Sequence, residues 1–89
     1  MSLFELGRVV ATPGALTRCE EANVSPSSLV ERHASGDWGG LDAHDLKENQ
    51  RALKDGTRIL SSYHTPAGRV WIITEADRAS TCLLLPEEY

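Results

Sequence analysis

The 89-residue sequence has few cysteines and no long hydrophobic run. Its two cysteines, Cys19 and Cys82, are far apart and form no CxxC pair, so neither a zinc site nor a disulfide framework is predicted. The apolar runs, such as residues 83–85, are far too short for a transmembrane helix. The first residues lack the basic and apolar regions of a signal peptide, so we expect a cytoplasmic protein with no membrane contact.

The sequence also has no excess of basic charge. Nine basic and thirteen acidic residues give a net charge of −4. Nucleic-acid-binding proteins usually carry a basic stripe, so direct nucleic-acid binding is disfavoured. The acids concentrate in residues 19–48, where seven of them accompany two bases. An acidic surface attracts basic partners at long range, but acids on solvated helix faces explain the same pattern.

A chain of this length forms one small domain, residues 1–89, with one core. Two hydroxyl–proline pairs predict helix starts, because the hydroxyl caps the helix and proline needs no N–H in the first turn. The pairs are Thr12 with Pro13 and Ser25 with Pro26, and the two helices are expected to end at Asn23 and Gly36. Leu16 and Cys19 are expected on the inner face of the first helix, with Ala15 and Ala22 as further candidates.

A third helix is predicted between Asp42 and Gly56. Asp42 is placed as the N-cap, with Asp45 three residues later, and glycine is the usual residue just past a helix end. Leu46, Asn49 or Gln50, and Leu53 are expected to mark one face of this helix.

The second half of the chain changes to a strand pattern. Residues 58–63, 70–74 and 81–85 are rich in β-branched and aliphatic residues, and their short connections favour an antiparallel meander. Residues 4–11 are predicted to be an extended segment or an edge strand. Helices followed by strands indicate an α+β fold, with the N-terminal helices packed on a three-stranded antiparallel meander.

No motif for catalysis or cofactor binding is evident. No serine lies in a GxSxG sequence, and residues 36–40 lack the lysine of a phosphate-binding loop. His33, Asp37 and His44 are the candidate ligands of a metal site, but their spacing puts no two of them on one helical face. We therefore expect no cofactor and no metal, and favour a non-enzymatic role.

Two short runs are the candidate protein-binding surfaces. The first, residues 32–39, surrounds Trp38, which either anchors a partner or packs as a plug between the second and third helices. The second, residues 71–78, ends in a charged connector in which Asp77 and Arg78 are expected to pair. The candidate partner-binding residues are Arg32, His33, Asp37, Trp38, Glu75, Asp77 and Arg78.

Four segments resemble a family of small, functionally uncharacterised proteins of proteobacterial plasmids, phages and integrated elements. They are VVATPGAL (residues 9–16), RHASGDWG (32–39), ALKDGTRILSSY (52–63) and WIITEADRASTCLLLPEEY (71–89). Some members carry a label that links them to restriction–modification subunits, but this chain has no methyl-donor loop. The resemblance implies a mobile-element setting and supplies no catalytic residues.

Three functions follow as hypotheses. The first is a small non-enzymatic protein of a mobile element that binds a host or element-encoded protein. It would be an inhibitor of the anti-restriction or anti-CRISPR type, which acts by occluding a host defence complex. The second is a small metal-dependent enzyme or factor that uses His33, Asp37 and His44. The third is a structural homo-oligomeric subunit, such as a homodimer, in which residues 70–74 or 81–85 pair with a second copy.

Overall fold

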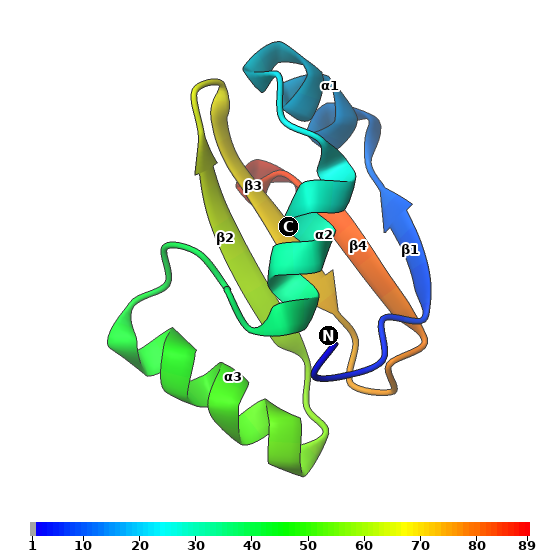
Figure 1. The fold of residues 1–89 in the computed structure, drawn as a ribbon, viewed down its shortest axis with the longest axis vertical. Helices are drawn as coiled ribbons and strands as arrows, with labels where there is room; N and C mark the ends of the chain where they lie inside the picture. Colours follow the sequence, from blue (N-terminus) through cyan, green and yellow to red (C-terminus); the bar gives the residue numbers. More distant parts are fainter. Residues whose placement is uncertain (1) are drawn as a thin grey trace.

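A computed structural model describes residues 2–89 and shows helices on a single sheet (Figure 1). The order is β1 (Arg8–Ala11), α1 (Pro13–Ala22), α2 (Pro26–Ser35), α3 (Ala43–Asp55), β2 (Ile59–Thr65), β3 (Gly68–Thr74), β4 (Ser80–Leu84) and the 3-10 turn η1 (Pro86–Glu88). The predicted α+β class is confirmed.

The sheet is four-stranded and mixed, with the strand order β1-β4-β3-β2. β2, β3 and β4 form the predicted antiparallel meander. β1 adds a fourth strand that runs parallel to β4, with Val10 opposite Cys82. The predicted meander and the predicted edge strand are therefore both present, but the prediction did not give the parallel direction of β1, which makes the sheet mixed and four-stranded. A parallel pair joins segments distant in sequence, so the local pattern carries no signal for it.

The helix boundaries agree closely with the predicted ones, but the Ser25 hydroxyl, predicted to cap α2, makes no capping hydrogen bond and lies 2.8 Å from the Ser27 hydroxyl. The Thr12 side chain accepts a hydrogen bond from the Ala15 N–H at 3.0 Å, and Asn23 ends α1 in the left-handed region at φ 56°. Asp42 accepts from the Asp45 N–H at 2.9 Å, and Gly56 ends α3 at φ 75°. Each of these signals is local, because a cap needs only a side chain within about three residues of the N–H that it binds.

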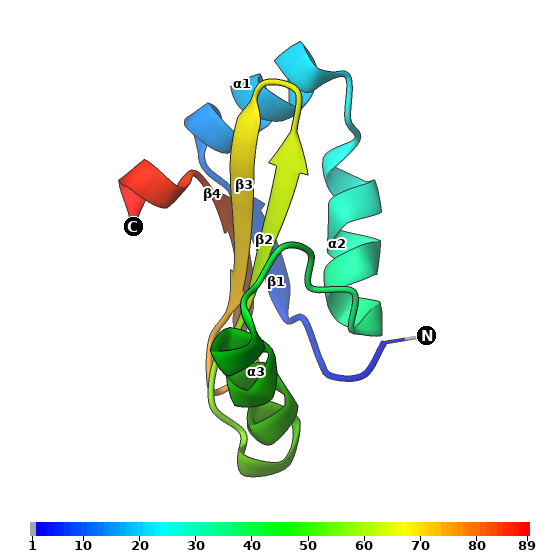
Figure 2. The ribbon, with the colours of Figure 1, turned by 90° about the vertical axis from the view of Figure 1, so that its left-hand side faces the viewer.

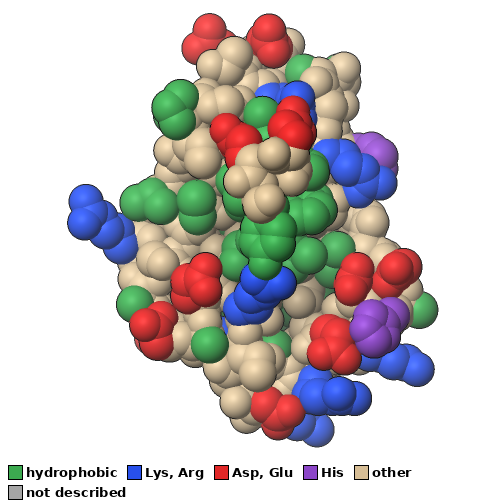
Figure 3. Space-filling view, turned by 180° about the vertical axis from the view of Figure 1, so that it is seen from behind, with side chains coloured by type: hydrophobic (Ala, Val, Ile, Leu, Met, Phe, Trp, Pro, Cys, Tyr) green, Lys and Arg blue, Asp and Glu red, His purple; other side chains and the backbone are tan. Residues whose placement is uncertain are grey.

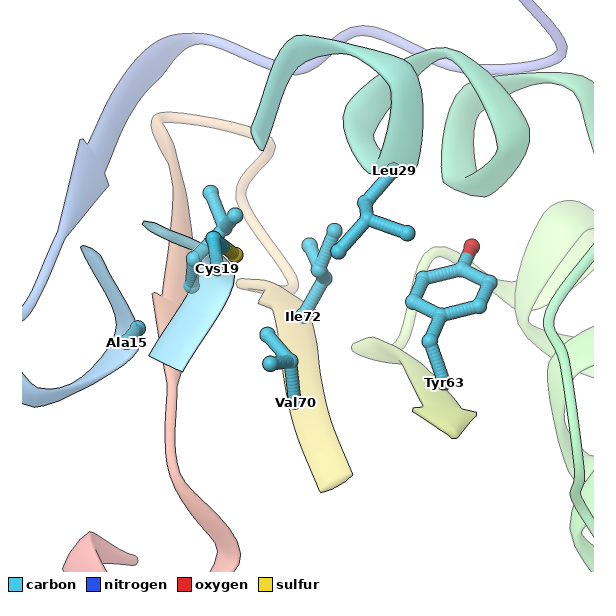
Figure 4. Close-up of a cluster of buried hydrophobic side chains, with 7 residues drawn as sticks. Ala15, Cys19, Leu29, Tyr63, Val70 and Ile72 are labelled. Carbon is cyan, nitrogen blue, oxygen red and sulfur yellow. The ribbon is translucent and has the colours of Figure 1, made fainter. Parts of the chain in front are cut away.

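The main core lies between one face of the sheet and the helices α1 and α2. Ala15 and Cys19 of α1 and Leu29 of α2 point toward the strands (Figure 4). Their partners in the sheet are Tyr63, Val70, Ile72 and Leu83. Edge-on, α2 lies on one side of the sheet and the C-terminal turn on the other (Figure 2). Within residues 2–89, no helix has the length and apolar content needed to cross a bilayer.

The predicted inner faces of two helices need correction. Leu16 is 48% exposed, so its predicted inner position is wrong, whereas Cys19 and the further candidate Ala15 do form the inner face of α1. Leu46 and Leu53 are 36% and 37% exposed, so they lie only at the border of the contact between α3 and β2. The buried positions of α3 are Asn49 and Ala52, because α3 meets the edge of the sheet, where backbone groups need a polar partner.

Candidate protein-interaction surfaces

Trp38 lies in the interior, as the plug interpretation predicts. Its side chain is 5% exposed and packs with Ala52 and Ile59 in a second small core. Backbone bonds anchor its loop to β2, since the Ser62 N–H donates to the Trp38 carbonyl at 3.1 Å and the Gly40 N–H donates to the Ser62 carbonyl at 2.7 Å. The indole Nε1 is buried without a hydrogen-bond partner. Trp38 therefore packs between α3 and β2 and is not available as a surface anchor.

Gly39 permits this close approach of the loop to β2. Its φ is +77°, and a Cβ at this position would collide with the Ser62 carbonyl oxygen. Glycine is therefore required here both for the backbone conformation and for the space.

His33 is fully buried between α2 and the sheet. Its Nδ1 lies 2.6 Å from the Ser61 hydroxyl and its Nε2 lies 2.8 Å from the Thr74 hydroxyl. The Thr74 hydroxyl continues to Thr81 at 2.7 Å, and Thr81 donates to the Leu6 carbonyl at 2.7 Å. Burial lowers the pKa of His33 to about 4, so the ring is neutral near pH 7. This chain of hydrogen bonds satisfies the polar groups inside the core.

The candidate metal ligands do not come together. Both ring nitrogens of His33 are used by hydroxyl groups, and Asp37 is bonded to Arg32. His44 lies exposed in the first turn of α3. In the described part of the chain, no group of three or more His, Cys, Asp or Glu side chains is arranged to hold a metal ion.

Arg32 and Asp37 form a charged pair at the end of α2. Arg32 donates through Nε to the Asp37 carboxylate at 2.7 Å and through a terminal nitrogen at 3.2 Å. Its guanidinium lies 4.5 Å from the centre of the Tyr63 ring, whose hydroxyl donates to the Asp37 carbonyl at 2.7 Å. The hydrogen bond from Arg32 lowers the pKa of Asp37, and burial raises the pKa of Tyr63 to about 12. The pair therefore fixes the loop that carries Trp38 and remains about half exposed (45% and 54% of the side chains).

The connector between β3 and β4 is built around Arg78. Its guanidinium donates to the Thr57 carbonyl at 2.6 Å and to the Ala52 carbonyl at 3.1 Å, and it lies 5.7 Å from the centre of the Phe4 ring. Asp77 instead accepts from the Ala79 N–H at 2.9 Å. The predicted pairing of Asp77 with Arg78 is therefore wrong, because each side chain is used by nearby backbone groups.

The structure links the two predicted contact runs through Phe4 and Ala52. Both residues pack in the Trp38 cluster, and both contact Arg78. The seven predicted partner-binding residues differ in how far they are exposed to solvent. His33 and Trp38 lie inside, Arg78 is half-buried, and the exposed members are Arg32, Asp37, Glu75 and Asp77.

The sheet has a second face, turned away from α2, that sequence reasoning missed. One row of paired residues crosses all four strands, from Leu60 through Ile73 and Cys82 to Val10. Beside it Trp71 is paired with Ser62 and Leu84. We call these seven residues the open face. Residues 70–73 are apolar at every position, and this pattern indicates a strand that meets apolar surroundings on both sides.

Among residues 2–89, the C-terminal turn and Tyr89 lie across the open face (Figure 2). Three of its residues, Ser62, Ile73 and Leu84, are buried at 3%, 5% and 9% exposure, while Val10 is 40% exposed. The Tyr89 ring meets the Trp71 ring edge-on at 5.7 Å and is itself 63% exposed. Seen from this side, hydrophobic side chains gather along the centre of the face (Figure 3). A groove beside Trp71 leads to the start of α3, where Leu41, Asp42 and Asp45 line it. The open face is thus the one part of the sheet that no helix covers within residues 2–89.

Two exposed arginines flank the open face. Arg58 stacks on the Tyr89 ring at 5.1 Å and donates to its hydroxyl. Arg69 donates to the Ser62 hydroxyl at 2.6 Å. Among residues 2–89 neither arginine pairs with a carboxylate, whereas Arg18 nearby pairs with Glu87 at 3.2 Å. The apolar surface is therefore accompanied by two positive charges that form no ion pair among residues 2–89.

Cys19 and Cys82 are both free thiols. Burial raises the pKa of each, so both are poor nucleophiles near pH 7. No protein-family model, curated protein or solved structure matches the chain.

Proposed function

We propose that this chain is a small non-enzymatic protein that binds another protein through its open face. One observation carries the proposal, namely that the apolar row across all four strands has no helix over it. An apolar sheet face normally needs a covering layer, and among residues 2–89 a three-residue turn and Tyr89 lie on it. Val10 and Tyr89 remain 40% and 63% exposed and Trp71 is half-buried, and exposed apolar surface of this kind is a feature of binding sites.

The flanking charges favour a particular partner chemistry. Trp71 and Tyr89 supply aromatic contact area, and such residues are common anchors of protein interfaces. Arg58 and Arg69 stand beside them without acidic partners in the described residues. A partner protein that presents apolar side chains next to carboxylates fits this arrangement, because its acids would supply the missing ion pairs.

The setting is proposed from the resemblance to plasmid and phage proteins. In that setting the partner is a host or element-encoded protein in the cytoplasm, and a defence complex of the restriction or CRISPR type is the proposed target. Binding would act by occlusion, since the chain offers a rigid surface and a buried, hydrogen-bonded His33 in place of an accessible catalytic group.

Charge reversal on the open face tests the proposal, and circular dichroism checks the fold of the variant because Arg69 donates to the buried Ser62 hydroxyl. Wild-type protein is used to capture its partner from host lysate, and the dissociation constant is then measured with the purified partner. The variant Arg58→Glu/Arg69→Glu should weaken binding by more than about tenfold. The matched control, Lys47→Glu/Arg51→Glu on exposed positions of α3, makes the same change of net charge and should bind as wild type does.

A second variant separates the open face from the surface predicted from sequence. Glu75→Gln/Asp77→Asn neutralises the β3–β4 connector and keeps the acceptor that Ala79 needs. If this variant loses binding while the arginine variant keeps it, the partner contacts the connector and the open-face proposal is wrong. Capture of no partner, or equal affinity for every variant, also contradicts the proposal.

A further inference from the structure

The outer edge of β1 carries backbone groups that no strand satisfies. The Arg8 N–H donates to the Ala79 carbonyl at 2.9 Å, and the Thr12 N–H donates to the Leu83 carbonyl at 3.0 Å. In a parallel pair, the backbone N–H and C=O groups of every second residue bond to the same neighbouring strand. The backbone groups of Arg8, Val10 and Thr12 therefore point toward β4. Val9 and Ala11 therefore direct their N–H and C=O groups away from the sheet, and β4 is the only strand beside β1 within residues 2–89.

The opposite edge of the sheet, at β2, is closed by the chain itself. The Asn49 side chain donates to the Leu60 carbonyl at 2.6 Å and accepts from the Leu60 N–H at 3.1 Å. The Trp38 loop in the same way bonds both the N–H and the carbonyl of Ser62. The fold therefore protects one edge with an amide side chain and a loop and leaves the other edge free.

We propose that β1 pairs antiparallel with β1 of a second copy, about a two-fold axis at Val10, and joins two four-stranded sheets into one of eight strands. The backbone groups of Val9 and Ala11 point outward, and this axis places Val9 opposite the partner's Ala11. The N–H of each residue then donates to the carbonyl of the other across the interface. A two-fold interface must be self-complementary, and this register meets that requirement.

The side chains of β1 suit this register. Val10 lies on the axis and meets the partner's Val10, and a β-branched pair is favourable at directly opposed positions. Val9 and Val10 are 46% and 40% exposed in the single chain, so both have apolar area to bury. On the α2 side, a groove lined by Pro26 and Val30 continues beyond Val9 and provides apolar surface for the partner's Val9.

Charge complementarity at the ends of the strand favours a second copy as the occupant. Arg8 and Thr12 fall opposite each other in this register, so Arg8 meets the partner's Thr12. The Thr12 hydroxyl donates to the Glu88 carboxylate at 2.7 Å, and this carboxylate therefore stands beside the position that the partner's arginine reaches. Arg8 has no carboxylate partner among residues 2–89. Two such pairs form across the axis, and no like charges are opposed.

Sedimentation of the purified chain over about 1 µM to about 1 mM tests this interface, independently of any other partner. The wild type is expected to pass from monomer to dimer as its concentration rises. Val9→Pro removes an outward N–H that β4 does not use, so the monomer keeps its fold while the dimer dissociation constant rises more than about tenfold. The control Leu53→Lys, on α3 beside the opposite edge, should dimerise as wild type does.

Two further variants keep the proposal falsifiable. Val9→Lys places a charge on the edge strand without changing the backbone, and it should also weaken the dimer. It replaces Val9→Pro in the test if the proline variant fails to fold. Arg8→Glu should weaken the dimer by repelling the partner's Glu88, and adding Glu88→Lys should restore it. A wild-type chain that stays monomeric throughout, or dimers that survive both Val9 substitutions, would overturn the proposal. Failure of Glu88→Lys to restore the dimer would overturn the register.

Discussion

The buried His33 predicts a specific loss of stability in mild acid. In the folded protein burial lowers the pKa of His33 to about 4, while the ordinary pKa of an exposed histidine is 6.5. The folded state therefore keeps the ring neutral as the pH falls, whereas the unfolded chain takes up a proton. Stability is fully present above the unfolded pKa and is lost as the pH drops toward the folded pKa.

The size of this loss follows from the difference between the two pKa values. A difference of about 2.5 pKa units corresponds to about 3 kcal/mol when the pH lies below both values. Between pH 7 and pH 5, where few carboxylates titrate, the expected loss is about 2 kcal/mol. For a domain of this size, that is a substantial part of the free energy of unfolding.

Urea unfolding followed by circular dichroism at pH 7, 6 and 5 measures the effect. The variant His33→Gln removes the titrating ring and keeps one donor and one acceptor for Ser61 and Thr74, so its stability should be nearly flat over this range. His64→Gln, at an exposed position, is the control and should keep the wild-type slope. A wild-type protein without this slope, or a His33→Gln variant that retains it, would refute the reasoning.

Three further predictions concern the edge at β2 and the Trp38 plug. Gly39→Ala should destabilise the fold by about 2–4 kcal/mol in urea unfolding, because the added Cβ meets the Ser62 carbonyl in a left-handed backbone. Asn49→Ala should cost about 2 kcal/mol by leaving both Leu60 backbone groups unpaired, whereas Gln50→Ala at the exposed neighbouring position should change stability by less than about 0.5 kcal/mol. Trp38→Ala should cost about 3–5 kcal/mol by calorimetry. Trp38→Phe should cost much less, because the indole N–H has no partner to lose; equal losses for the two variants would contradict this account.

Local signals in the sequence were sufficient for the helix boundaries. Thr12, Asp42 and Gly56 act on backbone groups only a few residues away, so their roles could be predicted from spacing alone. The pairing of β1 with β4 could not, because it joins segments about seventy residues apart and no local pattern encodes it. The spacing placed Asn49 or Gln50 on the same helix face as Leu46 and Leu53, but it gave no sign that the Asn49 amide closes a sheet edge, since a polar residue on a helix usually indicates a solvated position.

The candidate site shows the same division. The importance of residues 32–39 was evident from their composition, and the structure places Trp38 in a core that composition alone could not distinguish from a surface anchor. The open face escaped prediction because its residues alternate with core residues along the same strands. Trp71 and Ile72 are neighbours in sequence, but only the arrangement of α2 decides which of them is covered.

The two tryptophans provide the most direct test of the claim that the open face is the binding surface. Each indole N–H gives its own signal in a nitrogen–proton NMR spectrum, one from Trp71 on the open face and one from Trp38 in the interior. On titration with the captured partner, the Trp71 signal should shift or broaden while the Trp38 signal stays in place. A Trp71 signal that is unchanged at saturating partner would contradict the account.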